Sequence, residues 1–192
     1  MLKKICGKKS ALVVGICGLS VIIFFLLQNK EVPDGFESSI LDGLPIKAEH
    51  IELIGKYTYT EIFSDPEYNF TFRYPSGFEI MKIPDGLNNI VIVQDRRTQI
   101  GIQIISSKLG ESIPEITEGF LGEELPDLVV QNFHTVQSGG VQGLLFDSTN
   151  PHFQNGSSEL WFARGKMIYQ LSTYRALRPL LESVAQTWKF NE

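Results

Sequence analysis

The chain has 192 residues, 43% of them hydrophobic, which is enough for one membrane helix and one globular domain and argues against a second soluble domain. Its formal net charge of −5 is unevenly spread, because the positions from Glu31 onward carry 12 basic and 22 acidic side chains, a net charge of −10. A body this acidic repels phosphate groups, which argues against nucleic acid as a partner.

The first predicted element is a membrane helix over residues 11–28. Residues 10–29 contain no charged side chain, and a helix of that length spans roughly 25 to 30 Å, about the hydrocarbon thickness of a bilayer. A cleaved signal peptide is the alternative, but its apolar region is usually only about 7 to 15 residues and ends at a small-x-small site. This apolar run instead ends in Phe24, Phe25, Leu26 and Leu27. The sequence therefore favours an uncleaved anchor in the lipid bilayer.

A basic tail, residues 1–10, precedes this helix and contains Lys3, Lys4, Lys8 and Lys9. Positively charged flanks of membrane helices stay in the cytoplasm. We therefore expect a cytoplasmic N-terminus and an extracytoplasmic C-terminal body, in the periplasm or at the cell surface. Ala11, Gly15 and Gly18 share one face of the predicted helix and could allow two anchors to pair, so the oligomeric state stays open.

Residues 29–56 are predicted to be a linker. They mix proline, glycine and scattered charges with little hydrophobic periodicity, which is typical of a tether. Both cysteines, Cys6 and Cys17, precede this linker. The domain predicted over residues 57–192 therefore contains no disulfide framework.

Alternation of apolar and polar residues predicts that this domain is rich in strands. Turn-forming residues separate the alternating segments, so most neighbouring strands should form antiparallel hairpins in a meandering sheet. Residues 90–93 are apolar on both faces, which predicts a central strand that is covered on each side. The predicted strands are Tyr57–Phe63, Asn69–Tyr74, Phe78–Ile83, Asn89–Gln94, Gln99–Ser106, Val129–Val136, Val141–Asp147, Glu159–Ala163 and Met167–Thr173.

Two segments have helical periodicity instead. The last one, from Leu177 to Trp188, repeats apolar residues at three and four positions and has Pro179 near its start. The other is expected to begin at a capping box formed by Ser112 and Glu115 and to end before Pro126. The sequence therefore predicts an α+β domain, an α/β/α sandwich around a mainly antiparallel sheet.

The body resembles the PsbP-like domains over roughly residues 57–190. The resemblance is carried by the segment Phe70–Phe78 (FTFRYPSGF), the Ser138–Val141 turn, the Met167–Ser172 strand and the closing segment Leu180–Phe190. Phe78 stands where many relatives have tryptophan. The resemblance implies an α/β/α sandwich that serves mainly as a non-catalytic binding or assembly module. It assigns no functional residue to this chain, because the matching positions are turn and core residues.

The sequence predicts no catalytic, cofactor or metal site. Three histidines are far apart and fit no metal-binding pattern: His50, His134 and His152. Ser138 precedes two glycines and is interpreted as part of a hairpin turn and not as a nucleophile, because no GxSxG motif occurs. Two acidic pairs lack calcium-loop spacing and are expected to be exposed: Glu123–Glu124 and Asp65 with Glu67.

The resulting functional hypothesis is a membrane-anchored, extracytoplasmic, non-catalytic module that binds a protein partner in a cell-envelope complex. The alternative is an envelope hydrolase or a small-ligand-binding protein with an unrecognised pocket, around His134 or His152 with a carboxylate. No cofactor is expected in either case.

Overall fold

The computed structural model describes residues 56–191, apart from residues 86, 87, 99 and 154. The predicted tail, the anchor and nearly all of the predicted linker lie outside these residues. Within the described part of the chain, no helix is both long enough and apolar enough to span a bilayer. The structure therefore bears on the predicted domain over residues 57–192.

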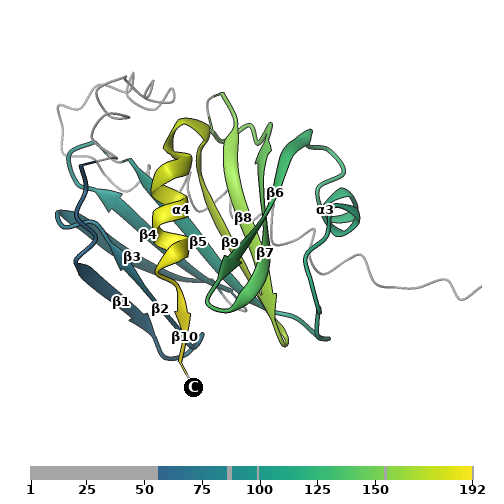
Figure 1. Ribbon diagram of the computed structural model, residues 1–192, viewed down its shortest axis with the longest axis horizontal. Coiled ribbons are helices and arrows are strands. Elements are labelled where there is room, and N and C mark those ends of the chain that lie inside the picture. Colours follow the sequence, from purple (N-terminus) through teal and green to yellow (C-terminus); the bar gives the residue numbers. More distant parts are fainter. Residues whose placement is uncertain (1–55, 86–87, 99, 154, 192) are drawn as a thin grey trace, which may run out of the picture.

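In the described residues the largest element is a seven-stranded sheet whose neighbouring strands are all antiparallel. Two meanders, β3-β4-β5 and β6-β7-β8-β9, join through the pairing of β5 with β9 (Figure 1). This confirms an α+β fold with a mainly antiparallel sheet. In spatial order the strands are β3 (Phe78–Asp85), β4 (Asn88–Asp95), β5 (Gly101–Lys108), β9 (Met167–Tyr174), β8 (Ser157–Arg164), β7 (Val141–Ser148) and β6 (Val130–Ser138).

A second, three-stranded sheet consists of β1 (Glu61–Asp65), β2 (Phe70–Tyr74) and β10 (Lys189–Phe190). The sequence pattern predicts a single meandering sheet that contains its first two strands together with the others. β2 instead pairs with β1 on one side and with the end of the chain on the other. The alternating rings of β2 pack on Trp188, with the Phe70 ring stacked 4.4 Å from it between centroids. Burial of these rings keeps the small sheet on the large one.

Helix α4 (Arg178–Gln186) lies close to its predicted position and follows a short 3₁₀ turn, η2 (Arg175–Leu177). It buries four apolar side chains on the same side of the large sheet as β2, namely Leu180, Leu181, Val184 and Ala185. Pro179 sits in the first turn, where its missing N–H costs nothing. Trp188 lies beyond the end of the helix and is buried in the same core.

Helix α3 (Glu118–Glu124) is shorter than predicted and begins elsewhere. Its N-cap is Thr117, whose hydroxyl oxygen accepts a hydrogen bond from Phe120 N at 3.1 Å, so the expected capping box is wrong. The chain before it runs along the β8–β9 turn, where Ile113 N donates to the Gly165 carbonyl at 3.2 Å. The proline after Ile113 also disfavours helical backbone there.

Apolar cores cover both faces of the large sheet. Helix α4 and the small sheet lie on one face, which we call the α4 face, and α3 with the loop before it packs on the other, the α3 face. Residues 90–93 of β4 are buried on both faces, as predicted. However, β4 lies second from the edge of the sheet, and β9 occupies its centre.

Candidate functional site

The most polar part of the interior lies where β7 and β8 pair. Asp147 on β7 and Glu159 on β8 are each only 4% exposed. Because successive side chains alternate between faces, Asp147 shares the α4 face with Leu145, and Glu159 shares the α3 face with Trp161. One strand pair therefore carries a carboxylate into each of the two cores.

Asp147 is surrounded by donors and cations. Ser158 Oγ donates to it at 2.6 Å and Asn132 Nδ2 at 2.9 Å. Arg178 Nη1 lies 3.6 Å and Arg175 Nε 3.8 Å from its carboxylate oxygens. Burial raises the pKa of Asp147, but these hydrogen bonds and the two arginines outweigh burial and hold its pKa below the usual value. The ionised carboxylate thus links β6, β7 and β8 to the start of α4.

Glu159 has a different set of partners on the α3 face. Its Oε1 atom accepts hydrogen bonds from Ser157 Oγ at 2.7 Å and Ser148 Oγ at 2.8 Å. Its Oε2 atom accepts one from Trp161 Nε1 at 3.2 Å. Ser148 and Ser157 are also direct cross-strand partners. The hydroxyls of both serines donate to the Glu159 carboxylate, so this cluster of hydrogen bonds stabilises the pairing of β7 with β8.

The structure does not bring the histidines of the hydrolase alternative to an acid. His134 is exposed on β6, and His152 is half-buried in the loop between β7 and β8, where burial lowers its pKa. Among the described residues, neither imidazole forms a hydrogen bond with a carboxylate or a serine, and His50 lies outside them. The same part of the chain contains no group of three or more potential metal ligands.

Ser138 has a structural partner. Its buried hydroxyl donates to the Ala185 carbonyl at 3.0 Å and so ties the β6–β7 hairpin to the end of α4. Gly139 and Gly140 have φ angles of 59° and 81°, the left-handed values of a two-residue type I′ turn. The turn interpretation of this segment is confirmed.

The acidic pairs differ in their outcome. Asp65 is fully buried, which corrects the expectation of an exposed loop carboxylate, whereas Glu67 is exposed. Glu123 is exposed as expected, but Glu124 is half-buried. Burial and the neighbouring Glu123 raise the pKa of Glu124.

Two buried carboxamides were missed at the level of sequence. Gln103 on β5 and Gln170 on β9 are nine-tenths or more buried on the α3 face, and neither Nε2 atom has a hydrogen-bond partner. Gln103 lies opposite Ser172, and Ser172 lies opposite Glu159, so the amides adjoin the Glu159 cluster. The available signal was a glutamine in the middle of each apolar run, IQI and YQL.

Strand β6 forms one edge of the large sheet. β6 pairs only with β7 in the described residues. None of its nine residues is charged. Val129, just before it, is 61% exposed. This edge therefore offers main-chain and apolar groups to a partner.

Comparisons with known proteins leave the family open. No family model matches the sequence, and no curated protein matches it. One solved structure that partly matches this chain is that of a protein from Bacteroides thetaiotaomicron VPI-5482, with 13% identity and a TM-score of 0.46. The match covers 70% of this chain and 50% of that protein, so the chain spans about half of its length.

Proposed function

We propose that the chain is a membrane-anchored, extracytoplasmic, non-catalytic binding or assembly module of a cell-envelope complex. Residues 1–10 are its cytoplasmic tail, 11–28 its membrane anchor, 29–56 its tether, and 57–192 a PsbP-like α/β/α sandwich. The observation that carries this proposal is the uncharged stretch over residues 10–29, which precedes a strongly acidic body. Only lipid relieves the cost of exposing such a stretch to water.

The described domain supports a binding role over a catalytic one. Three of the reactive groups in its interior, Asp147, Glu159 and Ser138, are engaged in hydrogen bonds that hold strands and α4 together. Its surface instead presents an open strand edge at β6. A tether raises the local concentration of such a surface near membrane partners, so modest affinity is sufficient for assembly.

The test uses the full-length chain in its host or in a bacterial host. We expect it in the membrane fraction, resistant to alkaline extraction, with the domain cleaved by a protease added from outside the cytoplasmic membrane. Crosslinking before solubilisation should recover a reproducible protein partner. Placing two arginines in the apolar segment, at Val21 and Ile22, should release the protein or block its insertion, because each costs about 2.5 to 3.5 kcal/mol there.

The matched control places the same two arginines in the predicted tether, at Ile46 and Ile51, and should leave the fractionation unchanged. Recovery of the unaltered full-length chain entirely in the soluble fraction would contradict the proposal.

A small-ligand-binding role is the second candidate, and the unpartnered carboxamides of Gln103 and Gln170 favour it. Buried amides without partners cost free energy unless a ligand or water satisfies them. Native mass spectrometry of gently solubilised protein should then show a bound mass that Gln103→Leu removes. This candidate is eliminated if no mass is bound and the Gln103→Leu variant is at least as stable as the unaltered protein. The hydrolase alternative has no comparable observation in its favour among the described residues.

A further inference from the structure

Strand β6 is an edge strand whose second half lacks the usual protection against pairing. Natural edge strands carry lysines, prolines or bulges that keep other chains away. β6 has neither a charged residue nor a proline, and a single irregularity lies between Gln131 and His134, where Asn132 has a φ of 58°. From His134 to Ser138 the pairing with β7 is regular. This half of the strand is open to a further strand.

The register identifies the main-chain groups that face outward. Ser138 and Val141 flank the two-residue turn and pair directly, so they form a hydrogen-bonded pair of the antiparallel ladder. The residues that alternate with this pair, beginning at Gln137, then point their N–H and C=O groups away from β7. These residues are Thr135 and Gln137, and both are exposed. An extended peptide could therefore pair with them.

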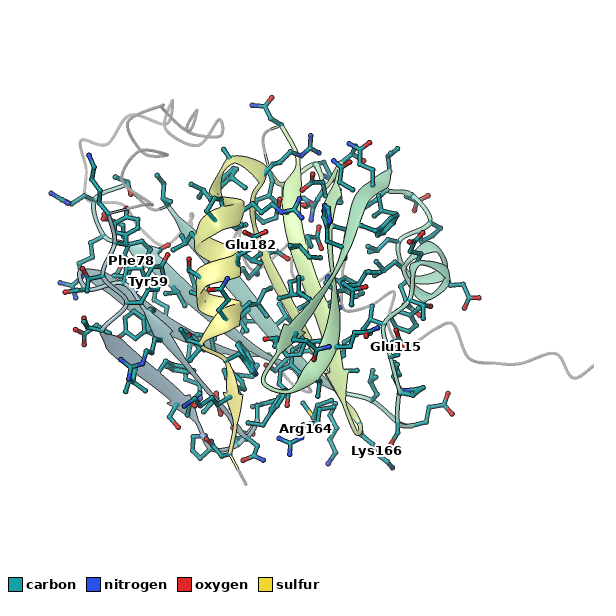
Figure 2. All side chains as sticks on the ribbon, viewed as in Figure 1. Tyr59, Phe78, Glu115, Arg164, Lys166 and Glu182 are labelled. Carbon is teal, nitrogen blue, oxygen red and sulfur yellow. The ribbon has the colours of Figure 1, made fainter. Side chains whose placement is uncertain are left out.

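The surroundings of this edge are acidic. Residues 109–163 contain no lysine and no arginine. Gln137 pairs with Gln142, whose side-chain amide donates to the Glu115 carboxylate, so Glu115 is held beside the regular half of the edge. Figures 1 and 2 show α3 and Glu115 on this side of the sheet, next to β6 and β7. The exposed acidic residues of this segment include Glu115, Glu118, Glu123 and Asp127.

We infer that the outer edge of β6 binds an extended, basic segment of a partner protein as an added strand, with its lysines or arginines facing the acidic α3 segment. Main-chain hydrogen bonds would supply affinity and the charges would supply specificity. A second copy of this chain is the disfavoured occupant, because two acidic α3 segments would then approach each other. The inference deepens the proposed function and rests on it.

The experiment measures binding of two labelled peptides to the full-length protein in lipid nanodiscs. One peptide alternates valine with lysine over about six residues, a typical strand length, and the other has glutamate in place of lysine. We expect the basic peptide to bind with an affinity that falls as the salt concentration rises. We expect the acidic peptide not to bind. Gln137→Pro removes an outward N–H that the β7 ladder does not use, so the fold should survive. It should weaken binding about tenfold, the effect of roughly one to two lost hydrogen bonds.

Charge variants provide the matched comparison. The double variant Glu118→Lys with Glu123→Lys should bind the basic peptide more weakly. The double variant Glu61→Lys with Glu67→Lys, on β1 and in the β1–β2 loop, should have little effect. The inference would be overturned if both peptides bound equally, or if the basic peptide bound the Gln137→Pro variant as tightly as the unaltered protein. It would also be overturned if the chain formed a dimer that Gln137→Pro abolished.

The two proposals fail in different ways. If a membrane partner is still recovered with the Gln137→Pro variant, the β6 edge is not its binding site, but the proposal of a tethered binding module stands. If the full-length chain is soluble, the proposal of a tethered module is wrong. The peptide measurement would still show whether the β6 edge binds a basic strand.

Discussion

The Asp65 carboxylate lies 2.8 Å from the ammonium group of Lys82 and joins the small sheet to the large one. The same Oδ2 atom accepts a hydrogen bond from Asn89 Nδ2 at 2.8 Å. Its Oδ1 atom accepts from the backbone N–H groups of Glu67 and Tyr68 in the β1–β2 loop. The fully buried Asp65 side chain thus bonds both to the β1–β2 loop and to two strands of the large sheet.

Replacing this carboxylate should be costly. Asp65→Ala leaves the Asn89 amide and two backbone N–H groups without their acceptor, so we expect a loss of about 2 to 4 kcal/mol in the free energy of unfolding. Urea denaturation measures it. Glu79→Ala is the control, because Glu79 pairs with the largely exposed Arg96 and should cost less than about 1 kcal/mol. Equal losses in the two variants would contradict the assigned role of Asp65.

The two glycines of the β6–β7 turn should respond differently to alanine. A Cβ at Gly139 would lie 2.9 Å from ring atoms of Phe190 and Trp188, whereas one at Gly140 meets open space. Both have positive φ, so each alanine costs about 1 to 2 kcal/mol of backbone strain. Gly139→Ala should cost about 1 to 3 kcal/mol more, through overpacking. Thermal unfolding of the two variants provides the comparison, and a Gly140→Ala variant that is the less stable of the two would refute it.

Asp147 should contribute to acid sensitivity. Its folded-state pKa lies below the ordinary value of 3.8 despite its burial, owing to Ser158, Asn132 and the two nearby arginines. The stability it contributes is therefore present above pH 3.8 and is lost as the pH falls through its folded-state pKa. Unfolding measured between neutral and acidic pH should show a smaller acid-induced loss in Asp147→Asn. An unchanged acid profile in that variant would exclude this contribution.

Tyr169 should have the opposite effect at alkaline pH. Burial raises its pKa from 10.0 to about 12, and its hydroxyl donates to the Tyr68 carbonyl at 3.0 Å. Because the folded-state pKa is raised, its contribution is present below pH 10 and is lost as the pH rises through about 12. Burial also raises the pKa of four other tyrosines, so tyrosinate absorbance should show several late-titrating phenols, of which Tyr169→Phe removes one. Titration of all tyrosines near the ordinary value, before unfolding, would contradict this environment.

Local patterns were sufficient for most strands of the domain. Alternation at β2, β7 and β9 and the glycine turn after Ser138 depend on neighbours in the chain, and the observed elements lie close to the predicted ones. The predicted start of α3 is wrong. Ser112 and Glu115 satisfy the local capping rule, but the backbone N–H of Ile113 is hydrogen-bonded to a turn that is distant in the sequence. A local rule contains no information about that turn.

The alternating strands, the glycine turn and the amphipathic α4 can be predicted from the sequence alone, because each follows from residues within a few positions of one another. The uneven charge can be read from the sequence directly. Three features emerge only from the assembled domain: β1 and β2 form a separate sheet with β10, Asp65 is buried against Lys82, and the outer edge of β6 is open. These outcomes depend on contacts between residues far apart in the chain, such as Asn69 and Asn191. Their free energy is gained only when the whole core assembles.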